Sequence, residues 1–373
     1  MHILVTGGAG FIGSHIVDLL LEAGHKVRVL DSLEPQVHGP SGQPPSYLDP
    51  EAEFMRGDVR DRAAVSRALR GVEAVYHEAA MVGVGQSMYE IERYVSCNSV
   101  GAAVLLDVIQ AERRDLARLV VASSMSIYGE GLYGCEACGP VSPKLRPTEQ
   151  LSRHEWEMRC PGCGREVGPR ATPETKPLAP TSVYAVTKRD HEELVLSFGE
   201  AYRIPAVALR YFNAYGPRQA LGNPYTGVAA IFSCRLLSGN PPLVFEDGLQ
   251  SRDFVHVRDV ARANLLALTS EKAPGHAINV GSGQPTSLRR LIEILAEQLG
   301  KKVSPSYLDQ FRAGDIRHCF ADLGRARELL GFEPAIPFEK GVEDLCAWAG
   351  GQTPRDGGEQ ARAELASRGL IQA

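Results

Sequence analysis

The sequence predicts an α/β protein: a doubly wound parallel sheet with a smaller C-terminal substrate-binding domain and a cysteine-rich insert. Three observations support this. Short apolar runs alternate with amphipathic stretches along the first half of the chain. The runs are apolar almost throughout, which is typical of parallel strands buried on both faces. A glycine-rich turn joins the first run to the first amphipathic stretch. Such sheets bind ligands beyond the C-terminal ends of their strands.

The elements follow from apolar periodicity and length. The expected strands are residues 2–6, 26–30 (ending at Asp31), 74–77, 118–122 and 206–211. The expected helices are residues 11–23, 61–70, 91–113 and 182–202. Residues 35–50 are rich in Pro, Gly and Ser and predict an exposed loop. The segment 129–180 is too long for a structureless connection inside a compact domain, so it needs a stabilising link of its own.

Length and charge limit the function. A chain of 373 residues holds one large domain or two smaller ones sharing a cleft. The net charge of −5 provides no general basic surface, so we expect no binding to nucleic acid. No apolar run approaches the roughly 20 residues of a membrane span. The first strand begins at His2 and leaves no room for a signal peptide. We therefore expect a cytoplasmic protein.

The turn after the first strand has the pattern of a dinucleotide site. The spacing of Gly7, Gly10 and Gly13 allows a tight turn and a close approach to a pyrophosphate, which the helix N-terminus then binds. Asp31 ends the second strand, 18 residues after Gly13. A carboxylate there accepts hydrogen bonds from ribose hydroxyls and repels a 2′-phosphate, which favours NAD over NADP. The pattern predicts a Rossmann domain that binds NAD.

Further residues at strand ends are candidates for the same site. Asp58 has two interpretations: a contact to the adenine amino group, or an N-cap for the helix that follows. His77 is interpreted as structural. The expected cofactor-binding residues are Gly7, Gly10, Phe11, Ile12, Gly13, Asp31, Ser32, Asp58, Val59, Ala79, Ala80, Asn98, Tyr184, Lys188 and Tyr211.

A catalytic set is predicted from Ser124, Tyr184 and Lys188. Tyr184 and Lys188 are four residues apart and share one face of a helix. A neighbouring ammonium favours the phenolate, so Tyr184 can take a proton from a sugar hydroxyl. Ser124 leaves the end of a strand and can hydrogen-bond the reacting oxygen.

These motifs resemble those of the extended short-chain dehydrogenase/reductases, in particular the UDP-glucose 4-epimerases and their close relatives. Matching stretches run from residue 1 to about residue 348 and include the segments 210–218, 250–257 and 312–317. The resemblance implies that the protein is a homodimer formed through two long helices. It implies an NAD-dependent enzyme acting on a nucleotide-diphosphate sugar, most favourably a UDP-hexose. The implied substrate-binding residues are Ser124, Ser126, Asn213, Arg252, Arg312 and Asp315.

The resemblance also narrows the reaction. Relatives that eliminate water or decarboxylate carry an acid just after the catalytic Ser or Thr, whereas Met125 and Ser126 stand here. Epimerisation at C4 needs no third acid and is favoured over a sugar-nucleotide 4,6-dehydratase; a uronic acid 4-epimerase stays open. A non-catalytic NAD-sensing protein is disfavoured by the intact catalytic set. Cys319 falls where relatives restricted to plain hexoses carry a bulky aromatic residue, which raises the hypothesis that the pocket accepts an N-acetyl group.

The insert carries two cysteine pairs. Cys135 and Cys138 are separated by 21 residues from Cys160 and Cys163. Paired C-x-x-C knuckles of this kind are typical of a structural, four-thiolate zinc site. Two disulfides are the alternative, disfavoured in a reducing cytoplasm. The remaining cysteines are interpreted as small buried side chains, namely Cys97, Cys234, Cys319 and Cys346.

These patterns also divide the chain. Residues 1–130, 171–212 and 256–284 are expected to form the NAD-binding domain. Residues 213–255 and 285–350 are expected to form the sugar-nucleotide-binding domain. Residues 131–170 form the zinc-binding insert, which we expect near the sugar pocket as a lid, a specificity element or a subunit contact. Residues 351–373 are a charged tail, either a short helix or frayed.

Overall fold

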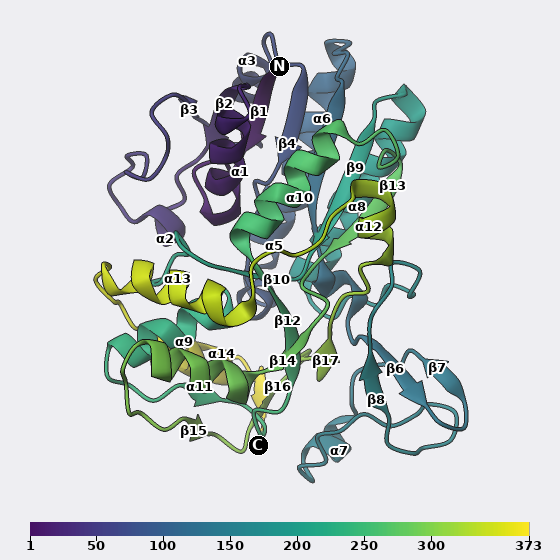
Figure 1. Cartoon of the computed structure of the whole chain (residues 1–373), viewed down its shortest axis with the longest axis vertical. Coiled ribbons are helices and arrows are strands. Elements are labelled where there is room, and N and C mark those ends of the chain that lie inside the picture. Colours follow the sequence, from purple (N-terminus) through teal and green to yellow (C-terminus); the bar gives the residue numbers. More distant parts are fainter. Residues whose placement is uncertain (373) are drawn as a thin grey trace.

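The computed structural model describes residues 1–372, and a seven-stranded parallel sheet lies at its centre (Figure 1). The strand order is β13-β9-β5-β4-β1-β2-β3, so the order reverses between β1 and β4. Ligands of doubly wound sheets bind at this reversal. The strands are β1 (His2–Thr6), β2 (Lys26–Asp31), β3 (Glu53–Arg56), β4 (Ala74–His77), β5 (Arg118–Ser124), β9 (Ala206–Tyr211) and β13 (His276–Val280). The predicted fold class is confirmed.

Helices cover both faces of this sheet and form two cores. On one face lie α1 (Phe11–Glu22), α10 (Val257–Thr269) and α12 (Gly324–Leu330), and on the other α3 (Arg62–Ala68), α6 (Gly101–Ala111) and α8 (Val183–Tyr202). Every residue of β4, β5 and β9 is buried, which accounts for their continuous apolar sequences. The domain boundaries expected from the sequence stay a prediction.

The long helix before β5 is not regular. It consists of α5 (Ile91–Val95), a π-helical turn η1 (Ser96–Val100) and α6. The most apolar 18-residue window within its 21 residues has a mean hydropathy of 1.3, so the helix is long and apolar enough for a membrane span. The expectation that no run approaches this length is therefore wrong. The helix packs against α8 and α3 in the sheet's outer layer, and 44% of its most apolar window is buried in the protein. A core helix meets the same criteria, so this is weak evidence for a membrane.

A second, smaller domain packs at the C-terminal ends of the strands. Its sheet contains β10 (Asn213–Tyr215), β12 (Ser251–His256), β14 (Pro285–Ser287) and β17 (His318–Cys319). A third core lies between this sheet and three helices, α9 (Val228–Leu237), α11 (Leu288–Gln298) and α13 (Phe338–Gly350). The strands β11 (Leu243–Val244) and β15 (Ser306–Tyr307) pair beside it.

The C-terminal segment is ordered against this domain. Helix α14 (Gly358–Ser367) buries Ala361 and Leu365. Strand β18 (Ile371–Gln372) pairs antiparallel with β16 (Phe311–Arg312). Of the two expectations for this tail, a short helix is therefore the one found. The pairing with β16 attaches the end of the chain to a segment in which substrate-binding residues were expected.

The segment 35–50 is less exposed than predicted. It begins with α2 (Pro35–His38), where the Gln36 side chain donates hydrogen bonds to Gln86, in α4 (Val84–Ser87), and to Asn223, each at 3.0 Å. The Tyr47 hydroxyl donates to the Ala9 carbonyl at 3.0 Å. Tyr47 therefore attaches the segment to the glycine turn, and Gln36 attaches it to two further segments.

The cysteine insert forms a separate lobe at the lower right of Figure 1. It follows the 3-10 turn η2 (Met125–Tyr128) and contains α7 (Thr148–Leu151) and a three-stranded sheet in the order β7-β6-β8. These strands are β6 (Leu132–Cys135), β7 (Gly139–Val141) and β8 (Gly168–Arg170). A small core lies between the strands and the knuckles and contains Tyr133, Cys135, Met158, Cys160 and Val167. The lobe is thus too small to rely on a hydrophobic core alone.

The surface of the two long helices leads to a prediction about assembly. Ile91, Val95 and Val100 are exposed on one helix, and Val186 and Leu194 on the neighbouring α8. We expect a second copy of the chain to cover these apolar side chains, since exposed apolar patches mark contact surfaces. Sedimentation equilibrium should give twice the 40.4 kDa mass of one chain. In the Val95→Glu variant the measured mass should fall towards that of a single chain. A monomeric wild type would contradict the prediction.

Candidate active site

One cavity of about 690 Å³ lies between the two domains, at the C-terminal ends of the central strands. Its walls come from the glycine turn, from the ends of β2, β4, β5 and β9, from the start of α8 and from the smaller domain. It joins the glycine turn, the catalytic residues and the predicted substrate-binding residues. Of the predicted cofactor-binding residues, all but Asn98 line it.

The glycine turn makes a close-packed cradle at the start of α1. Gly7 has φ +69°, and a methyl group there would lie 2.8 Å from the Ala79 backbone. A methyl group at Gly13 would overlap the Gly7 carbonyl oxygen. Asp31 is fixed at the end of β2 by hydrogen bonds from the backbone N–H groups of Ala9 (3.1 Å) and Leu33 (2.9 Å). These positions fit a dinucleotide whose ribose meets a carboxylate.

The structure separates the two interpretations of Asp58. The N-cap of α3 is Asp61, whose side chain accepts hydrogen bonds from Ala63 and Ala64, so the capping role for Asp58 is wrong. Asp58 instead lines the cavity and pairs with Arg60 at 2.6 Å. That hydrogen bond holds the pKa of the Asp58 carboxyl below its ordinary value.

Asn98 is a correction to the predicted cofactor contacts. Its side chain is fully buried in the π-helical turn, where it accepts from Met81 N–H at 2.7 Å and donates to Met81 C=O and to Thr187. It therefore lies behind the cavity wall and fixes the backbone of Met81, which does line the cavity. His77 is also fully buried, and burial lowers its pKa to about 3, as the structural interpretation requires.

Ser124, Tyr184 and Lys188 meet at the base of the cavity. Ser124 is the last residue of β5, and its hydroxyl accepts from the Ser126 hydroxyl at 3.0 Å. Ser182 caps α8 by accepting from Ala185 N–H at 3.1 Å, which places Tyr184 in the first turn. Lys188 donates to the Ala122 carbonyl at 2.9 Å. This hydrogen bond attaches the ammonium to β5, and Lys188 itself lies one turn along α8 from Tyr184.

Burial dominates the acidity of these groups. Desolvation raises the pKa of Tyr184 to about 12, although hydrogen bonding with Ser124 acts the other way. Desolvation lowers the pKa of Lys188 to about 8, although the charge of Glu78 acts the other way. At neutral pH, Lys188 is therefore still mostly charged and Tyr184 is protonated. A further positive charge near the ring would favour the phenolate.

Glu78 is a site residue that sequence reasoning missed. It follows β4 directly, lines the cavity and accepts a hydrogen bond from the Tyr211 hydroxyl at 3.0 Å. Burial raises the pKa of its carboxyl to about 7, while the charge of Lys188 lowers it. Glu78 directly follows His77, the last residue of β4. This position was the available signal, because polar residues at the C-terminal ends of parallel strands line the ligand crevice.

The second half of the cavity carries the predicted substrate-binding residues. Asn213, Arg252, Arg312 and Asp315 all line it, as do Ser124 and Ser126. The Oδ1 atom of Asn213 is buried, and none of the described residues donates a hydrogen bond to it. Arg312 pairs with Asp315 at 2.7 Å. A buried polar atom without a partner and two arginines suit a polar, anionic ligand.

The C-terminal helix contributes a wall that no sequence motif indicated. Arg362 and Leu365 of α14 line the cavity, and Leu365 lies against Gly85 of the NAD-binding domain. The Tyr225 hydroxyl joins Glu364 of α14 at 2.8 Å to Tyr89 at 2.6 Å. The tail therefore contacts both sides of the cleft. Contacts of this kind depend on the folded chain, so the sequence of the tail gave no signal for them.

The composition of the cavity wall bears on two expectations about the sugar end. Cys319 is buried beside Met125, Tyr128 and Phe212 and does not belong to the cavity wall, so its size gives no support to an N-acetyl pocket. Within residues 1–372, the cavity wall also contains none of residues 131–170. The insert therefore does not cover the sugar directly, although its two ends start beside the catalytic residues.

A Rossmann sheet with this glycine turn, a ribose-binding carboxylate and a Ser–Tyr–Lys set defines an NAD-dependent enzyme of the short-chain dehydrogenase/reductase type. The profile of the NAD dependent epimerase/dehydratase family matches residues 3–149 and 161–281. The chain belongs to this family. The gap between the two matched stretches falls within the insert, which agrees with a family domain interrupted by added sequence.

The relatives include several 4-epimerases of sugar nucleotides, together with a dTDP-glucose 4,6-dehydratase of Actinoplanes that is 30% identical over 93% of this chain and 97% of its own. The dTDP-L-rhamnose 4-epimerase of Burkholderia thailandensis is 35% identical over 93% of this chain and 94% of its own. The UDP-glucose 4-epimerase of Thermotoga maritima, solved with UDP-glucose, is 32% identical with a TM-score of 0.75 over 93% of this chain and 98% of its own. The UDP-glucuronic acid 4-epimerase of Bacillus cereus, solved with UDP-glucuronic acid and NAD, is 27% identical with a TM-score of 0.77, over 94% and 99%.

The cradle leads to a prediction about cofactor retention. Gly13→Ala should lower the affinity for NAD by roughly tenfold or more, because the added methyl group overlaps the Gly7 carbonyl and opens the turn. The dinucleotide released from the denatured protein, measured by chromatography, gives the occupancy. Gly350→Ala is the matched control, since a methyl group there has no neighbour within 4 Å. Equal occupancy in both variants would show that the turn tolerates the methyl group.

Proposed function

We propose that this protein inverts C4 of a nucleotide-diphosphate hexose, with a UDP-hexose as the first candidate. The observation that carries the proposal is Tyr184 beside Ser124 on the cavity wall, with no acid at the two positions after Ser124. The nearby Glu78 carboxylate is taken up by a hydrogen bond from the Tyr211 hydroxyl at 3.0 Å. Met125 and Ser126 follow Ser124, and neither is an acid near pH 7. One acid–base group is sufficient to remove a proton from a hydroxyl and return it. Elimination of water would need a further acid, so epimerisation is favoured.

Each catalytic residue has a separate role in such a reaction. Ser124 hydrogen-bonds the 4-oxygen of the sugar and orients it towards Tyr184, which removes the hydroxyl proton and later returns it. Lys188 keeps a positive charge one helical turn from Tyr184 and stabilises the Tyr184 phenolate. NAD would be held by the glycine turn and Asp31, and when bound it would supply reversible hydride transfer at C4 of the sugar. Because the cofactor is regenerated in each cycle, we expect it to stay bound through purification.

The other half of the cavity supports a diphosphate-linked substrate. Arg252 and Arg312 can neutralise the diphosphate, and Asn213 offers a buried carbonyl oxygen to a hydroxyl. According to their names, the relatives act on rhamnose, glucose and glucuronic acid linked to two different nucleobases. The sugar and the base are therefore matters for a direct assay.

The assay uses the purified protein with no added NAD. Incubation with UDP-, dTDP- and GDP-sugars, followed by NMR, should give C4-inverted product from at least one UDP-hexose. Tyr184→Phe should lower the rate by roughly 10²–10⁴-fold, because the acid–base group is lost, and should retain its bound NAD. A 4-keto-6-deoxy product would overturn the assignment and indicate a 4,6-dehydratase. Retained NAD with no turnover of any sugar would favour the NAD-sensing alternative.

We also propose that the insert holds a structural zinc ion. The four sulfurs of Cys135, Cys138, Cys160 and Cys163 lie within 4.8 Å of one another. Four thiolates at about 2.3 Å from zinc are separated by roughly 3.8 Å, so small movements suffice. The sulfurs of Cys135 and Cys163 are 3.5 Å apart, far beyond a disulfide bond of about 2.05 Å, and none of the four cysteines is in a disulfide. Backbone N–H groups of Cys163 and Gly162 lower the pKa of the Cys160 thiol to about 7, which favours the thiolate.

Metal analysis tests the zinc proposal. One zinc per chain is expected in protein purified without added metal, and Cys138→Ser should lower this content because a ligand is lost. Cys346→Ser is the matched control, since Cys346 is buried in another core. Thiol titration of the unfolded, metal-free protein without reductant should find all eight cysteines. Four thiols and no metal would show that the insert contains two disulfides instead.

A further inference from the structure

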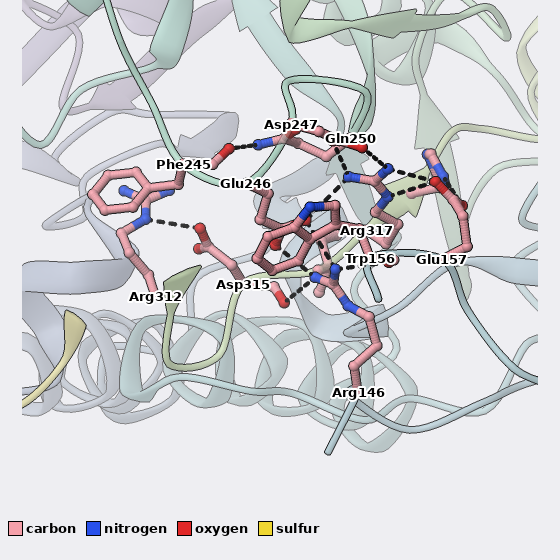
Figure 2. Close-up of polar contacts among 12 residues, drawn as sticks. Arg146, Trp156, Glu157, Phe245, Glu246, Asp247, Gln250, Arg312, Asp315 and Arg317 are labelled. Atoms are coloured by element: carbon pink, nitrogen blue, oxygen red, sulfur yellow. Dashed lines mark hydrogen bonds and ion pairs between the residues drawn. The ribbon is translucent and has the colours of Figure 1, made fainter. Parts of the chain in front are cut away.

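We propose that Arg146 and Glu157 of the insert are positioning residues for the nucleotide end of the substrate. They hold two loops of the smaller domain, residues 245–247 and 312–317, from the side away from the cavity (Figure 2). These loops present Phe245, Arg312 and Asp315 to the cavity. The inference rests on the proposed function, since it assumes that a nucleotide diphosphate occupies this half of the cleft.

Arg146 makes the first of the two attachments. Its guanidinium donates two hydrogen bonds of 2.8 Å to the Glu246 carboxylate, and the two side chains are 1% and 3% exposed. It also donates to the Trp156 carbonyl at 2.9 Å and contacts the Asp315 carbonyl at 3.5 Å. One insert side chain therefore joins both loops, in a setting where a planar, bidentate donor is strongest.

The backbone at Glu246 is held in an uncommon conformation. Its φ is +58°, in the left-handed region that a side chain with Cβ rarely adopts. Such a conformation persists where the surroundings fix it. Here the Arg146 pair fixes the side chain, and Glu246 N–H donates to the Gln310 carbonyl at 3.0 Å. Phe245, the preceding residue, owes its direction into the cavity to this local turn.

Arg317 makes the second attachment, at the centre of an acidic cluster. It is fully buried and donates to Asp247 at 2.7 and 2.9 Å and to Glu246 at 3.0 Å. From the insert, Glu157 accepts from the Arg317 Nε at 3.1 Å and also pairs with its terminal nitrogen. Hydrogen bonding with His318 and Arg317 holds the pKa of the Glu157 carboxyl at about 2, so this contact is ionic at any physiological pH.

The same loops determine the shape of the cavity wall. The Arg312 guanidinium stacks over the Phe245 ring, 4.9 Å from its centroid. The Arg252 side chain is held by the carbonyls of Ile316 (2.8 Å) and Arg317 (3.0 Å). Both arginines expected to neutralise the diphosphate therefore depend on backbone that the insert fastens. A loop that shifts by one or two ångströms would misplace them.

The cysteine cluster fixes the insert end of this connection. Glu157 precedes Met158, whose side chain is buried with Cys135 and Cys160. Val167 N–H donates to the Met158 carbonyl at 3.0 Å, and Cys160 N–H to the Arg165 carbonyl at 2.7 Å. Loss of the metal would free this hairpin and with it Glu157. The occupancy of the metal site is thereby linked to binding of the nucleotide, although no insert residue lies on the described cavity wall.

The test compares Glu157→Gln with Glu155→Gln in protein loaded with NAD. Glu155 lies in the same insert but is paired only with the exposed Arg153 and Arg159, so it is the matched control. Calorimetric titration with UDP should show an affinity about tenfold weaker for Glu157→Gln and unchanged for Glu155→Gln. KM for the sugar nucleotide should rise to the same extent, while kcat stays within about twofold. Arg146→Lys, which keeps the charge but loses the paired hydrogen bonds, should behave like Glu157→Gln.

Zinc content and NAD content separate the outcomes. Both should equal those of the wild type in Glu157→Gln, and removing zinc from the wild type with a chelator should weaken UDP binding with NAD retained. Equal UDP affinity in Glu157→Gln, Arg146→Lys and wild type would overturn the positioning role and leave the epimerase proposal standing. Loss of kcat and NAD together would indicate general destabilisation and also overturn it. Failure of the wild type to bind any nucleotide diphosphate would overturn both proposals.

Discussion

The parallel register of the central sheet is the constraint on which the site depends. Strands β1 and β4 end together, with Thr6 beside His77. His77 pairs with Val121, so β5 and β9 continue three residues further, to Ser124 beside Tyr211. This alignment brings the glycine turn, Glu78 and the catalytic serine to one edge, although they lie far apart in the sequence. Helix α8 then has to lie on the sheet at a fixed height for Tyr184 to reach that edge.

A buried ion pair holds that helix. The Glu192 carboxylate, two turns beyond Tyr184, accepts from the Arg210 Nε at 2.9 Å and from the Ser123 hydroxyl at 2.7 Å. Both charged side chains are about 5% exposed, so either one alone would be costly to bury. The pair joins α8 to β5 and β9 directly behind the catalytic residues. The low exposure of Lys188 has the same origin, because the helix face that carries it is packed on the sheet.

Local sequence was a good guide to the parts of the site that a short segment builds alone. The glycine turn, Asp31 and the i,i+4 pair of Tyr184 and Lys188 are such parts, and all of them line the cavity as expected. Asn98 was misplaced because a π-helical turn rotates its side chain away from the wall. Cys319 was misplaced because its surroundings come from three distant segments.

The remaining features required the folded chain. The roles of Glu78, Leu365 and Arg146 depend on partners 100 to 280 residues away, namely Tyr211, Gly85 and Glu246. No periodicity or spacing in one sequence encodes such pairs. The cysteine spacing did predict a cluster correctly, but it contained no information on which surface of the protein the insert would contact.

The way in which the insert is attached explains how the catalytic geometry tolerates it. Ala179 N–H donates to the Ile127 carbonyl at 3.0 Å, and the Lys176 ammonium donates to the Tyr128 carbonyl at 2.9 Å. The two ends of the insert are thus fastened together before the chain reaches Tyr184. Gly129, with φ +66°, sits so close to the Ala179 carbonyl that a side chain there would overlap it. A closed base of this kind isolates Ser124 and Tyr184 from motion in the lobe, so that any influence of the insert reaches the cleft through the smaller domain.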